Sequence, residues 1–435
     1  MQKKTKLSGR FWAALAVFSF IGQVAWVVEN MYFNVFIYKM FHAGPGDIST
    51  MVAASAVAAT LTTLLVGALS DKVGKRKIFI CLGYLLWGVS IWCFAWIRSD
   101  VIRRLFPAAS AASVGVSLVI IMDCVMTFFG SSANDACFNA WLTDSTDSTN
   151  RGAAEGVNAM MPLIAVLAVF GGFMGFDLNR SDAWVTIFTI IGAAVCAVGV
   201  LGVFLIREPA RRAGEKQSYF RNIFYGFRPS VMRRNRILYV ALLAYAIFGI
   251  AIQIFMPYLI LYYNVSLAMD NYVLVMAPAI LIAAIITAFY GKLYDRAGFR
   301  AAILPSAAML ILGCLCLFLF RSLPLVFAGS LLMLTGDLTG MAVFGAILRD
   351  YTPEGRAGQF QGLRIVSQVL IPMVIGPAAG ARILRSAAKV VNDDGTSSFI
   401  PNGKIFLASA VAALVMIPVL LWIFRLQKKE KRHED

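Results

Sequence analysis

The stretch GALSDKVGKRK (residues 67–77) has a counterpart, GKLYDRAGFR (residues 291–300), in the second half of the chain. Each stretch follows a long apolar run. They align at a constant offset of 224 residues at four positions, Gly67 and Gly291, Leu69 and Leu293, Asp71 and Asp295, and Gly74 and Gly298. Farther along, Asp144 is echoed by Asp350 at an offset of 206. Internal repetition of this kind is typical of transporters built from two parallel repeats.

The composition places both halves in a membrane. Hydrophobic residues make up 60% of the 435 residues and charged residues only 14%, against about 45–50% and about 25% in soluble domains. The net charge of +16 lies in short clusters between apolar runs, so it predicts membrane topology and no nucleic-acid partner. The seven cysteines form no CxxC pair and there are only two histidines. We therefore expect no disulfide framework, no metal site and no cofactor.

Apolar runs of about 20 residues predict membrane-spanning helices. An N-terminal bundle, residues 1–206, contains runs near 11–38, 48–69, 78–97, 112–141, 156–177 and 182–206. A basic cytoplasmic linker, 207–235, leads to a C-terminal bundle, 236–435, with runs near 236–263, 271–291, 301–320, 324–348, 361–385 and 404–426. The first run is too long for a signal peptide, so we expect an uncleaved first helix. The predicted fold is an all-α integral membrane protein with twelve transmembrane helices in two pseudo-symmetric six-helix bundles.

The distribution of basic residues predicts the orientation. Loops on the side of the two termini carry 28 lysines and arginines, and loops on the opposite side carry 10. Because cytoplasmic loops are enriched in these residues, we expect a multi-pass protein of the cell membrane with both termini in the cytoplasm.

The repeated loop has a physical rationale as a cytoplasmic gate. Glycines permit tight turns and close approach of helix ends, and an aspartate can face the positive N-terminal end of a helix in the opposite half. Such a contact would join the halves and open when they move. The predicted gate comprises Gly67, Asp71, Gly74, Arg76, Gly291, Asp295, Gly298 and Arg300.

The two loops resemble the signature of the major facilitator superfamily and its second-half copy. The resemblance covers essentially the whole chain, and it implies alternating access around a central cavity lined mainly by helices 1, 4, 7 and 10, with contributions from helices 2, 5, 8 and 11. The segment NDACFNAWLTD (residues 134–144) loosely resembles the melibiose-type glycoside and hexuronide cation symporters. Helix 2 lacks the acidic residues usual in those carriers, and helix 4 lacks the arginine typical of drug antiporters.

Four acidic residues lie inside the predicted spans, where a charge is costly and demands a reason. These coupling candidates are Glu29 in helix 1, Asp123 and Asp135 in helix 4, and Asp337 in helix 10. Counting along the helices puts Glu29 and Asp123 at the same depth, about 6 Å to the outside of the centre. Two facing carboxyl groups in a low-dielectric environment favour binding of a proton. The alternative is that each acid only fixes helix packing through a neighbouring hydroxyl or amide.

Polar and aromatic residues of the same helices suit a hydroxyl-rich ligand, because rings stack on the apolar face of a sugar and amides bond its hydroxyls. The substrate-binding candidates are Gln23, Trp26, Asn30, Asn158, Gln253, Tyr258, Arg364 and Gln368. Gln23, Trp26 and Asn30 are spaced to share one face of an α-helix. Aromatic residues at lipid interfaces are the competing interpretation.

A secondary active transporter is the function that these features favour. The sequence contains no Walker-type motif, which argues against an ATP-driven pump. The predicted helices contain no histidine and no paired cysteines, which argues against an enzyme. Nothing in the sequence indicates a symmetric pore. We expect a monomer that moves a small organic solute, a sugar or glycoside in first place, with H⁺ as the coupling ion and Na⁺ as the alternative. A multidrug or metabolite exporter driven by proton antiport and an uncoupled facilitator are the competing functions.

Overall fold

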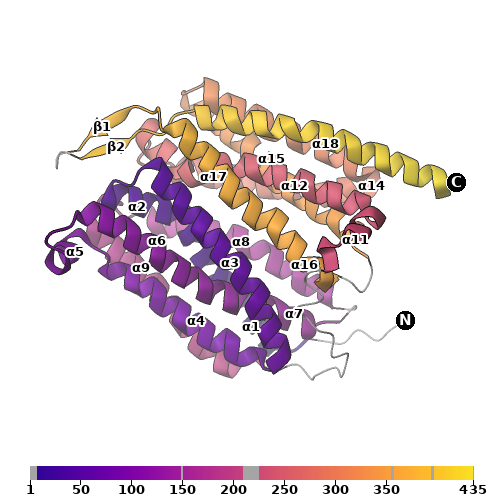
Figure 1. The fold of residues 1–435 in the computed structure, drawn as a ribbon, viewed down its shortest axis with the longest axis horizontal. Helices are drawn as coiled ribbons and strands as arrows, with labels where there is room; N and C mark the ends of the chain where they lie inside the picture. The colour runs from indigo at the N-terminus through magenta and orange to yellow at the C-terminus, as the bar shows by residue number, and fades with distance from the viewer. Residues whose placement is uncertain (1–6, 148–149, 209–224, 354–356, 393–395, 435) are drawn as a thin grey trace. The chain divides into compact units, whose positions relative to one another are not determined.

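The computed structural model describes residues 7–147, 150–208, 225–353, 357–392 and 396–434. The chain divides into two compact units, Met1–Tyr219 and Phe220–Asp435, whose helices are labelled in Figure 1. Both units consist of long apolar helices. Part of the predicted linker, residues 209–224, lies outside the described residues.

The first unit contains six membrane-spanning helical segments. Four of them are α3 (Pro45–Val73), α4 (Arg76–Cys93), α8 (Arg151–Phe173) and α9 (Ser181–Leu205). The first span runs through α1 (Gly9–Val27), η1 (Val28–Tyr32) and α2 (Phe33–Phe41), and the fourth through α6 (Ala111–Gly130), η3 (Ser131–Phe138) and α7 (Asn139–Asp144).

The second unit follows the same plan with one merged element. Its first span runs through α12 (Arg236–Phe255), η5 (Met256–Tyr258), α13 (Leu259–Leu261) and η6 (Tyr262–Ser266). The long helix α14 (Val273–Leu319) and α15 (Leu323–Asp350) follow. The next span runs through α16 (Ala357–Ile365), η7 (Val366–Leu370) and α17 (Ile371–Leu384), and the last is α18 (Lys404–Glu434).

Helix α14 accounts for the difference between twelve predicted spans and the eleven helices of the described chain that are long and apolar enough to cross a membrane. Its 47 residues would extend about 70 Å at 1.5 Å per residue, more than twice the hydrocarbon thickness. The chain kinks at Gly298, whose φ of 78° and ψ of 179° are not helical. The element therefore comprises two spans, and the twelve-helix prediction is confirmed. The predicted loop 292–300 is helical on both sides of that kink.

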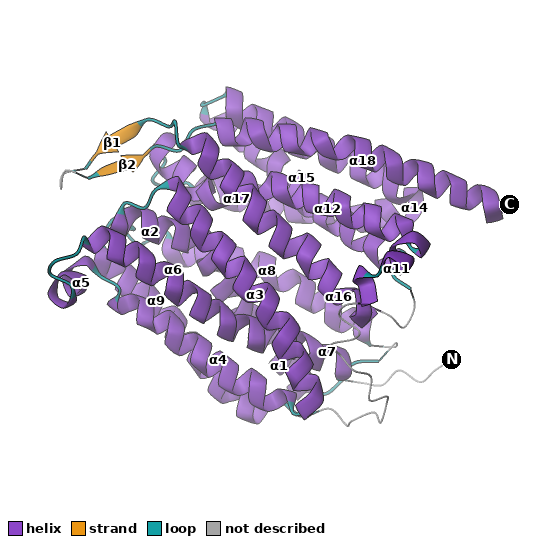
Figure 2. Ribbon diagram, viewed as in Figure 1, coloured by secondary structure: helices purple, strands orange, loops and turns teal. Residues whose placement is uncertain are grey.

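Short elements outside the spans were not predicted. Helix α5 (Ser99–Leu105) occupies the loop between the third and fourth spans, and α11 (Pro229–Arg234) precedes α12. A small antiparallel hairpin pairs β1 (Lys389–Val391) with β2 (Ser397–Phe399) between α17 and α18 (Figure 2). These elements leave the all-α character of the membrane portion unchanged.

Four spans contain a π-helical segment: η1, η3, η6 and η7. Such segments insert a residue into an α-helix and are frequent at functional sites. Glu29 lies in η1, Asp135 in η3 and Gln368 in η7. The insertion in η1 falls between Trp26 and Asn30, so these two residues do not keep the α-helical spacing from which a shared face was predicted.

Glycines bring helices into backbone contact within each unit. A Cβ added at Gly88 in α4 would lie 2.5 Å from the backbone nitrogen of Cys196 in α9 and 2.6 Å from the carbonyl oxygen of Gly192. In the second unit, a Cβ at Gly313 in α14 would lie 2.3 Å from the backbone nitrogen of Met333 in α15. These contacts hold the helix pairs at the short distance that only glycine permits.

Candidate functional site

A buried polar cluster of the first unit is centred on Glu29, which is 6% exposed. Ser55 Oγ in α3 donates to Glu29 Oε1 over 2.7 Å, and Thr127 Oγ1 in α6 donates to the same oxygen over 2.9 Å. The two hydroxyl oxygens are themselves 2.9 Å apart. Three spans thus contribute three oxygen atoms in mutual contact.

The second carboxyl group of this cluster is Asp123, which is 2% exposed and interacts electrostatically with Glu29. Glu29 Oε2 and Asp123 Oδ1 are both buried and accept no hydrogen bond from the described residues. Buried carboxylate oxygens are normally satisfied by donors. We call Glu29, Ser55, Asp123 and Thr127 the acidic cluster; its two vacant acceptors fit a proton or another small cation.

Asp135 lies near the acidic cluster without belonging to it. Ser131 Oγ donates to Asp135 Oδ2 over 3.0 Å, one helical turn earlier in the same π-helical segment. The carboxyl group of Asp135 interacts electrostatically with Glu29 and with Tyr84. The first unit therefore concentrates three acids in the membrane.

Three of the predicted substrate-binding residues of the first unit make contacts within that unit. Trp26 packs against Trp87, with ring centroids 5.0 Å apart, and the indole nitrogens of both are buried without an acceptor in the described chain. Asn30 is exposed and donates to the carbonyl oxygen of Trp26 over 2.8 Å. Asn158 in α8 accepts a hydrogen bond from Ser19. Gln23 is half-buried.

In the second unit, Asp337 is 7% exposed and its Oδ1 has no partner among the described residues. The neighbouring glycines serve tight packing. A Cβ at Gly336 would lie 2.3 Å from the backbone nitrogen of Leu310, and one at Gly340 would lie 2.4 Å from the ring of Phe248. Asp337 therefore lies where α15 packs closely against α14 and α12.

The other predicted substrate residues of the second unit differ in accessibility. Tyr258 is fully buried, and its hydroxyl donates to the carbonyl oxygen of Pro377 over 3.3 Å, which makes it a packing residue between two spans in this conformation. Gln253 also contacts the eleventh span, because a Cβ at Gly376 would lie 2.5 Å from Gln253 Cβ. Arg364 and Gln368 are half-buried.

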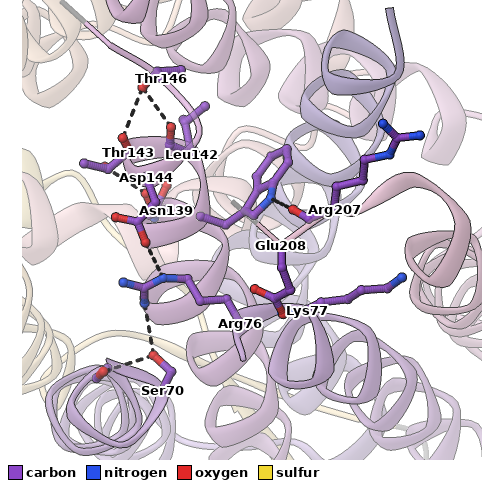
Figure 3. Close-up of polar contacts among 12 residues, drawn as sticks. Ser70, Arg76, Lys77, Asn139, Leu142, Thr143, Asp144, Thr146, Arg207 and Glu208 are labelled. Carbon is purple, nitrogen blue, oxygen red and sulfur yellow. Dashed lines mark hydrogen bonds and ion pairs between the residues drawn. The ribbon is translucent and has the colours of Figure 1, made fainter. Parts of the chain in front are cut away.

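The repeated loop of the first unit forms a polar network within that unit (Figure 3). Arg76 Nε lies 2.6 Å from Asp144 Oδ2, and Arg76 Nη1 donates to Ser70 Oγ over 3.2 Å. The Arg76 side chain is only 14% exposed, and it lies against a carboxylate of its own half. Gly74 has a positive φ of 67°, which fits the tight turn expected there.

The adjoining part of this network connects the loop to the end of α9. The backbone nitrogen of Lys77 donates to Glu208 Oε1 over 2.7 Å, and Lys77 Nζ donates to the carbonyl oxygen of Val203 over 2.6 Å. Trp141 Nε1 donates to the carbonyl oxygen of Arg207 over 2.8 Å. The adjoining ends of the third, fourth and sixth spans are thereby tied together. The side chain of Asp71 lies outside the described residues, so its expected helix-end partner is untested.

The copy of the loop in the second unit makes different side-chain contacts. Tyr294 Oη donates to Asp350 Oδ2 over 2.6 Å, in the place where the first unit uses Ser70, Arg76 and Asp144. Arg300 instead lies over the ring of Phe424, 5.5 Å from its centroid. Gly298 has the expected positive φ of 78°. At Gly291, however, no described atom lies within 4 Å of the place that a Cβ would take, so the expected close approach is not made there.

The comparisons with known proteins identify the family. The model of the major facilitator superfamily matches residues 11–377. The chain belongs to the major facilitator superfamily. It is thus a multi-pass membrane transporter of small molecules and not an enzyme, and the predicted fold class is confirmed. The likeness to the melibiose-type symporters remains loose.

Individual relatives of this superfamily transporter are distant. Sugar efflux transporter B of Salmonella typhimurium strain LT2 is 22% identical over 193 residues, which cover 44% of this chain and 45% of that protein. The match therefore spans less than half the length of this curated relative. The structure of the nucleoside transporter NupG aligns with a TM-score of 0.70 at 11% identity, covering 96% of this chain and 99% of that one. A D-xylose–proton symporter aligns with a TM-score of 0.65 at 14% identity, covering 93% and 97%. These structures share the fold.

Three polar residues of this transporter's candidate sites were not among the residues predicted from the sequence: Ser55, Thr127 and Tyr245. Ser55 and Thr127 bond Glu29 from other spans, and Tyr245 interacts electrostatically with both Asp337 and Arg364. Their only sequence signal is a polar group in an apolar helix, which many residues of this chain share.

Proposed function

We propose that this transporter moves a small hydroxyl-rich solute, a sugar or glycoside, by alternating access, and that a proton bound at the acidic cluster couples the movement to a gradient. The observation that carries the proposal is the pair of vacant buried carboxylate oxygens, Glu29 Oε2 and Asp123 Oδ1. Two uncompensated negative charges in a membrane interior are costly, and one bound proton removes much of that cost.

The relatives support the solute class through their names. A sugar efflux transporter, a nucleoside transporter and a D-xylose–proton symporter all act on molecules with sugar rings. The polar and aromatic side chains of the first unit, Trp26, Asn30 and Asn158 among them, fit such ligands by stacking and by hydrogen bonding. The word "efflux" in one name favours export as the direction, against import.

The network of the repeated loop supports the gate that we propose on the cytoplasmic side. In the first unit it joins three spans through Arg76, Asp144, Lys77 and Glu208, so those spans would move together. The location in the cell membrane with cytoplasmic termini belongs to the same proposal and rests on the excess of basic residues on the side of the termini.

The experiment that tests the coupling site is transport in proteoliposomes with Glu29→Gln. Glutamine keeps the acceptor oxygen for Ser55 and Thr127 but imitates a carboxyl group that never releases its proton. With a pH difference of one unit and one proton per cycle, the wild type should establish a solute ratio of up to about tenfold, since a tenfold ratio corresponds to 1.4 kcal/mol. Glu29→Gln should equilibrate solute without accumulation and retain exchange.

Two controls make this result specific. Asp182→Asn removes an exposed acid whose side chain is 72% accessible, and it should transport like the wild type. A Na⁺ gradient at constant pH should not drive accumulation. If Glu29→Gln still concentrates solute with unchanged pH dependence, Glu29 is a packing residue. Accumulation driven by Na⁺ alone would replace the proton by sodium at the same cluster.

A further inference from the structure

A groove lies between α8 and α9 in the first unit. The two helices follow each other in the chain and are joined by the short connection 174–180. Helices joined by so short a connection normally pack side by side. Here both helices pack against α1, but they make little contact with each other. The groove therefore has α1 and the inner faces of α8 and α9 as its floor, and the outer parts of α8 and α9 as its walls.

The groove is lined by apolar residues. It has a volume of about 330 Å³, and its lining carries no polar side chain among the described residues. Val169 in α8 and Ile187 and Val195 in α9 belong to the floor, where they are almost fully buried. The floor thus offers hydrocarbon along its whole length.

Small residues on the rim keep the groove open. Ala168 and Gly172 lie one helical turn apart on α8, and Ala194 lines the facing wall on α9. Ala168 and Gly172 are exposed, and a Cβ added at Gly172 would meet no described atom within 4 Å. The groove is therefore accessible along the side of these membrane spans.

The groove extends along the spans for about the depth of one leaflet. Its lining begins beside the connection at Phe176 and continues on α9 as far as Val195. At 1.5 Å per residue, Val195 lies about 20 Å along α9 from its first residue, Ser181. One leaflet contributes about 15 Å of hydrocarbon. The groove thus has the direction and the length of an acyl chain.

The chemistry of the lining selects the occupant. A bound water needs two to four polar partners, and a sugar needs hydrogen bonds to its hydroxyl groups. The described lining residues provide no polar side chain for either of them. An empty groove would leave its walls without dispersion contacts. Because acyl chains surround the spans of a membrane protein, an acyl chain is the ligand that fits and is present.

We propose that this groove binds one acyl chain of a membrane phospholipid, in the leaflet next to the connection 174–180. The acyl chain contacts α8 and α9 together and fills the space where these helices do not meet. No residue of the acidic cluster lines the groove in the described chain, so the inference does not depend on the proposed function.

The test is photocrosslinking of the full-length protein in proteoliposomes that contain phosphatidylcholine with a photoreactive acyl chain. Mass spectrometry then maps the labelled residues. Labelling of residues 187–195 in α9 should exceed that of residues 411–415 in α18. The latter lie at a similar distance from the start of their helix, include the exposed side chains of Val411, Leu414 and Val415, and do not line the groove.

Gly172→Leu places a branched side chain in the groove. It should reduce labelling of residues 187–195 about tenfold, since excluding about two methylene groups of the acyl chain suffices for a change of that size. Ala194→Leu fills the groove from the facing wall and should act in the same way. The matched control is Gly171→Leu, which adds the same bulk at the next residue of α8. Its Cβ would also meet no described atom within 4 Å, but Gly171 does not line the groove, so labelling should equal that of the wild type.

Equal labelling of residues 187–195 and 411–415 in the wild type would overturn the proposal, and this comparison decides even if a variant fails to fold. Unchanged labelling in both Gly172→Leu and Ala194→Leu, with Tm values near that of the wild type, would also overturn it. Labelling by a photoreactive fatty acid but not by the phosphatidylcholine would assign the groove to a different apolar ligand and reject the phospholipid.

Discussion

Replacing Gly88 by alanine should separate α4 from α9 and destabilise the first unit. The added Cβ would lie 2.5 Å from the backbone nitrogen and from the Sγ of Cys196, and 2.6 Å from the carbonyl oxygen of Gly192. Ordinary contacts of such atoms are about 3.5–4 Å, so the two helices must move apart by about 1 Å. Two of the three contacted atoms belong to the backbone, which a rotamer change cannot move.

The size of the effect follows from two opposing terms. Overpacking of a well-packed interface costs about 1–3 kcal/mol, and alanine in place of glycine within a helix returns about 0.5–1 kcal/mol. The net loss should be about 0.5–2 kcal/mol. For a unit of this size that corresponds to a fall in Tm of about 1–8 °C. Gly313→Ala should act in the same way in the second unit, because its Cβ would meet the backbone nitrogen of Met333 at 2.3 Å.

Intrinsic tryptophan fluorescence of the purified protein during a thermal ramp measures this change. The matched control is Gly171→Ala in α8, where no described atom lies within 4 Å of the added Cβ, and its Tm should stay constant or rise. A Gly88→Ala protein as stable as the wild type would refute the reasoning, since the helices would then tolerate a wider separation without loss. A fall in Tm of the control as large as that of Gly88→Ala would equally refute it.

Two further predictions concern the repeated loop. Asp71→Asn should impair transport without preventing membrane insertion, and Asp295→Asn should have a milder effect if the two halves contribute unequally to closure. Cysteine labelling measures the cytoplasmic accessibility of the Asp71→Asn protein. Wild-type turnover together with normal accessibility in that protein would exclude the gate. Arg76→Gln removes the ion pair with Asp144 and should lower the free energy of unfolding by at most about 1 kcal/mol, because Asp144 is partly exposed and such pairs contribute little. A loss well above that value in chemical denaturation would show that the pair is energetically central.

The fold was largely predictable, because it depends on features that a sequence displays directly. Long apolar runs, the excess of basic residues on one side and the loop repeated at a constant offset together specify twelve helices in two halves. The kink at Gly298 illustrates the limit of this reasoning. The sequence indicates a turn there, yet the helical geometry continues on both sides of that residue.

The candidate site was less predictable, because hydroxyl side chains in membrane helices have two kinds of partner. Thr60 donates to the carbonyl oxygen of Ala56 in its own helix, the common local pattern, whereas Ser55 and Thr127 donate across helices to Glu29. Hydropathy does not separate these cases. The acids could be predicted because a charge in an apolar run is conspicuous. Their hydroxyl partners could not be predicted, because a hydroxyl group in such a run is common.

The π-helical segment Val28–Tyr32 makes the first span sensitive to the count of its residues. Deleting one residue there would restore an uninterrupted α-helix and preserve hydropathy, length and insertion into the bilayer. The turns on either side would keep their directions, because the wide turn is what accommodates the extra residue. The residues within the segment would be re-spaced, and Glu29 is one of them, so its carboxyl group would no longer be aimed at Ser55 and Thr127. The span therefore tolerates many exchanges of one apolar residue for another, but a single-codon deletion within the π-helical segment would disturb the acidic cluster.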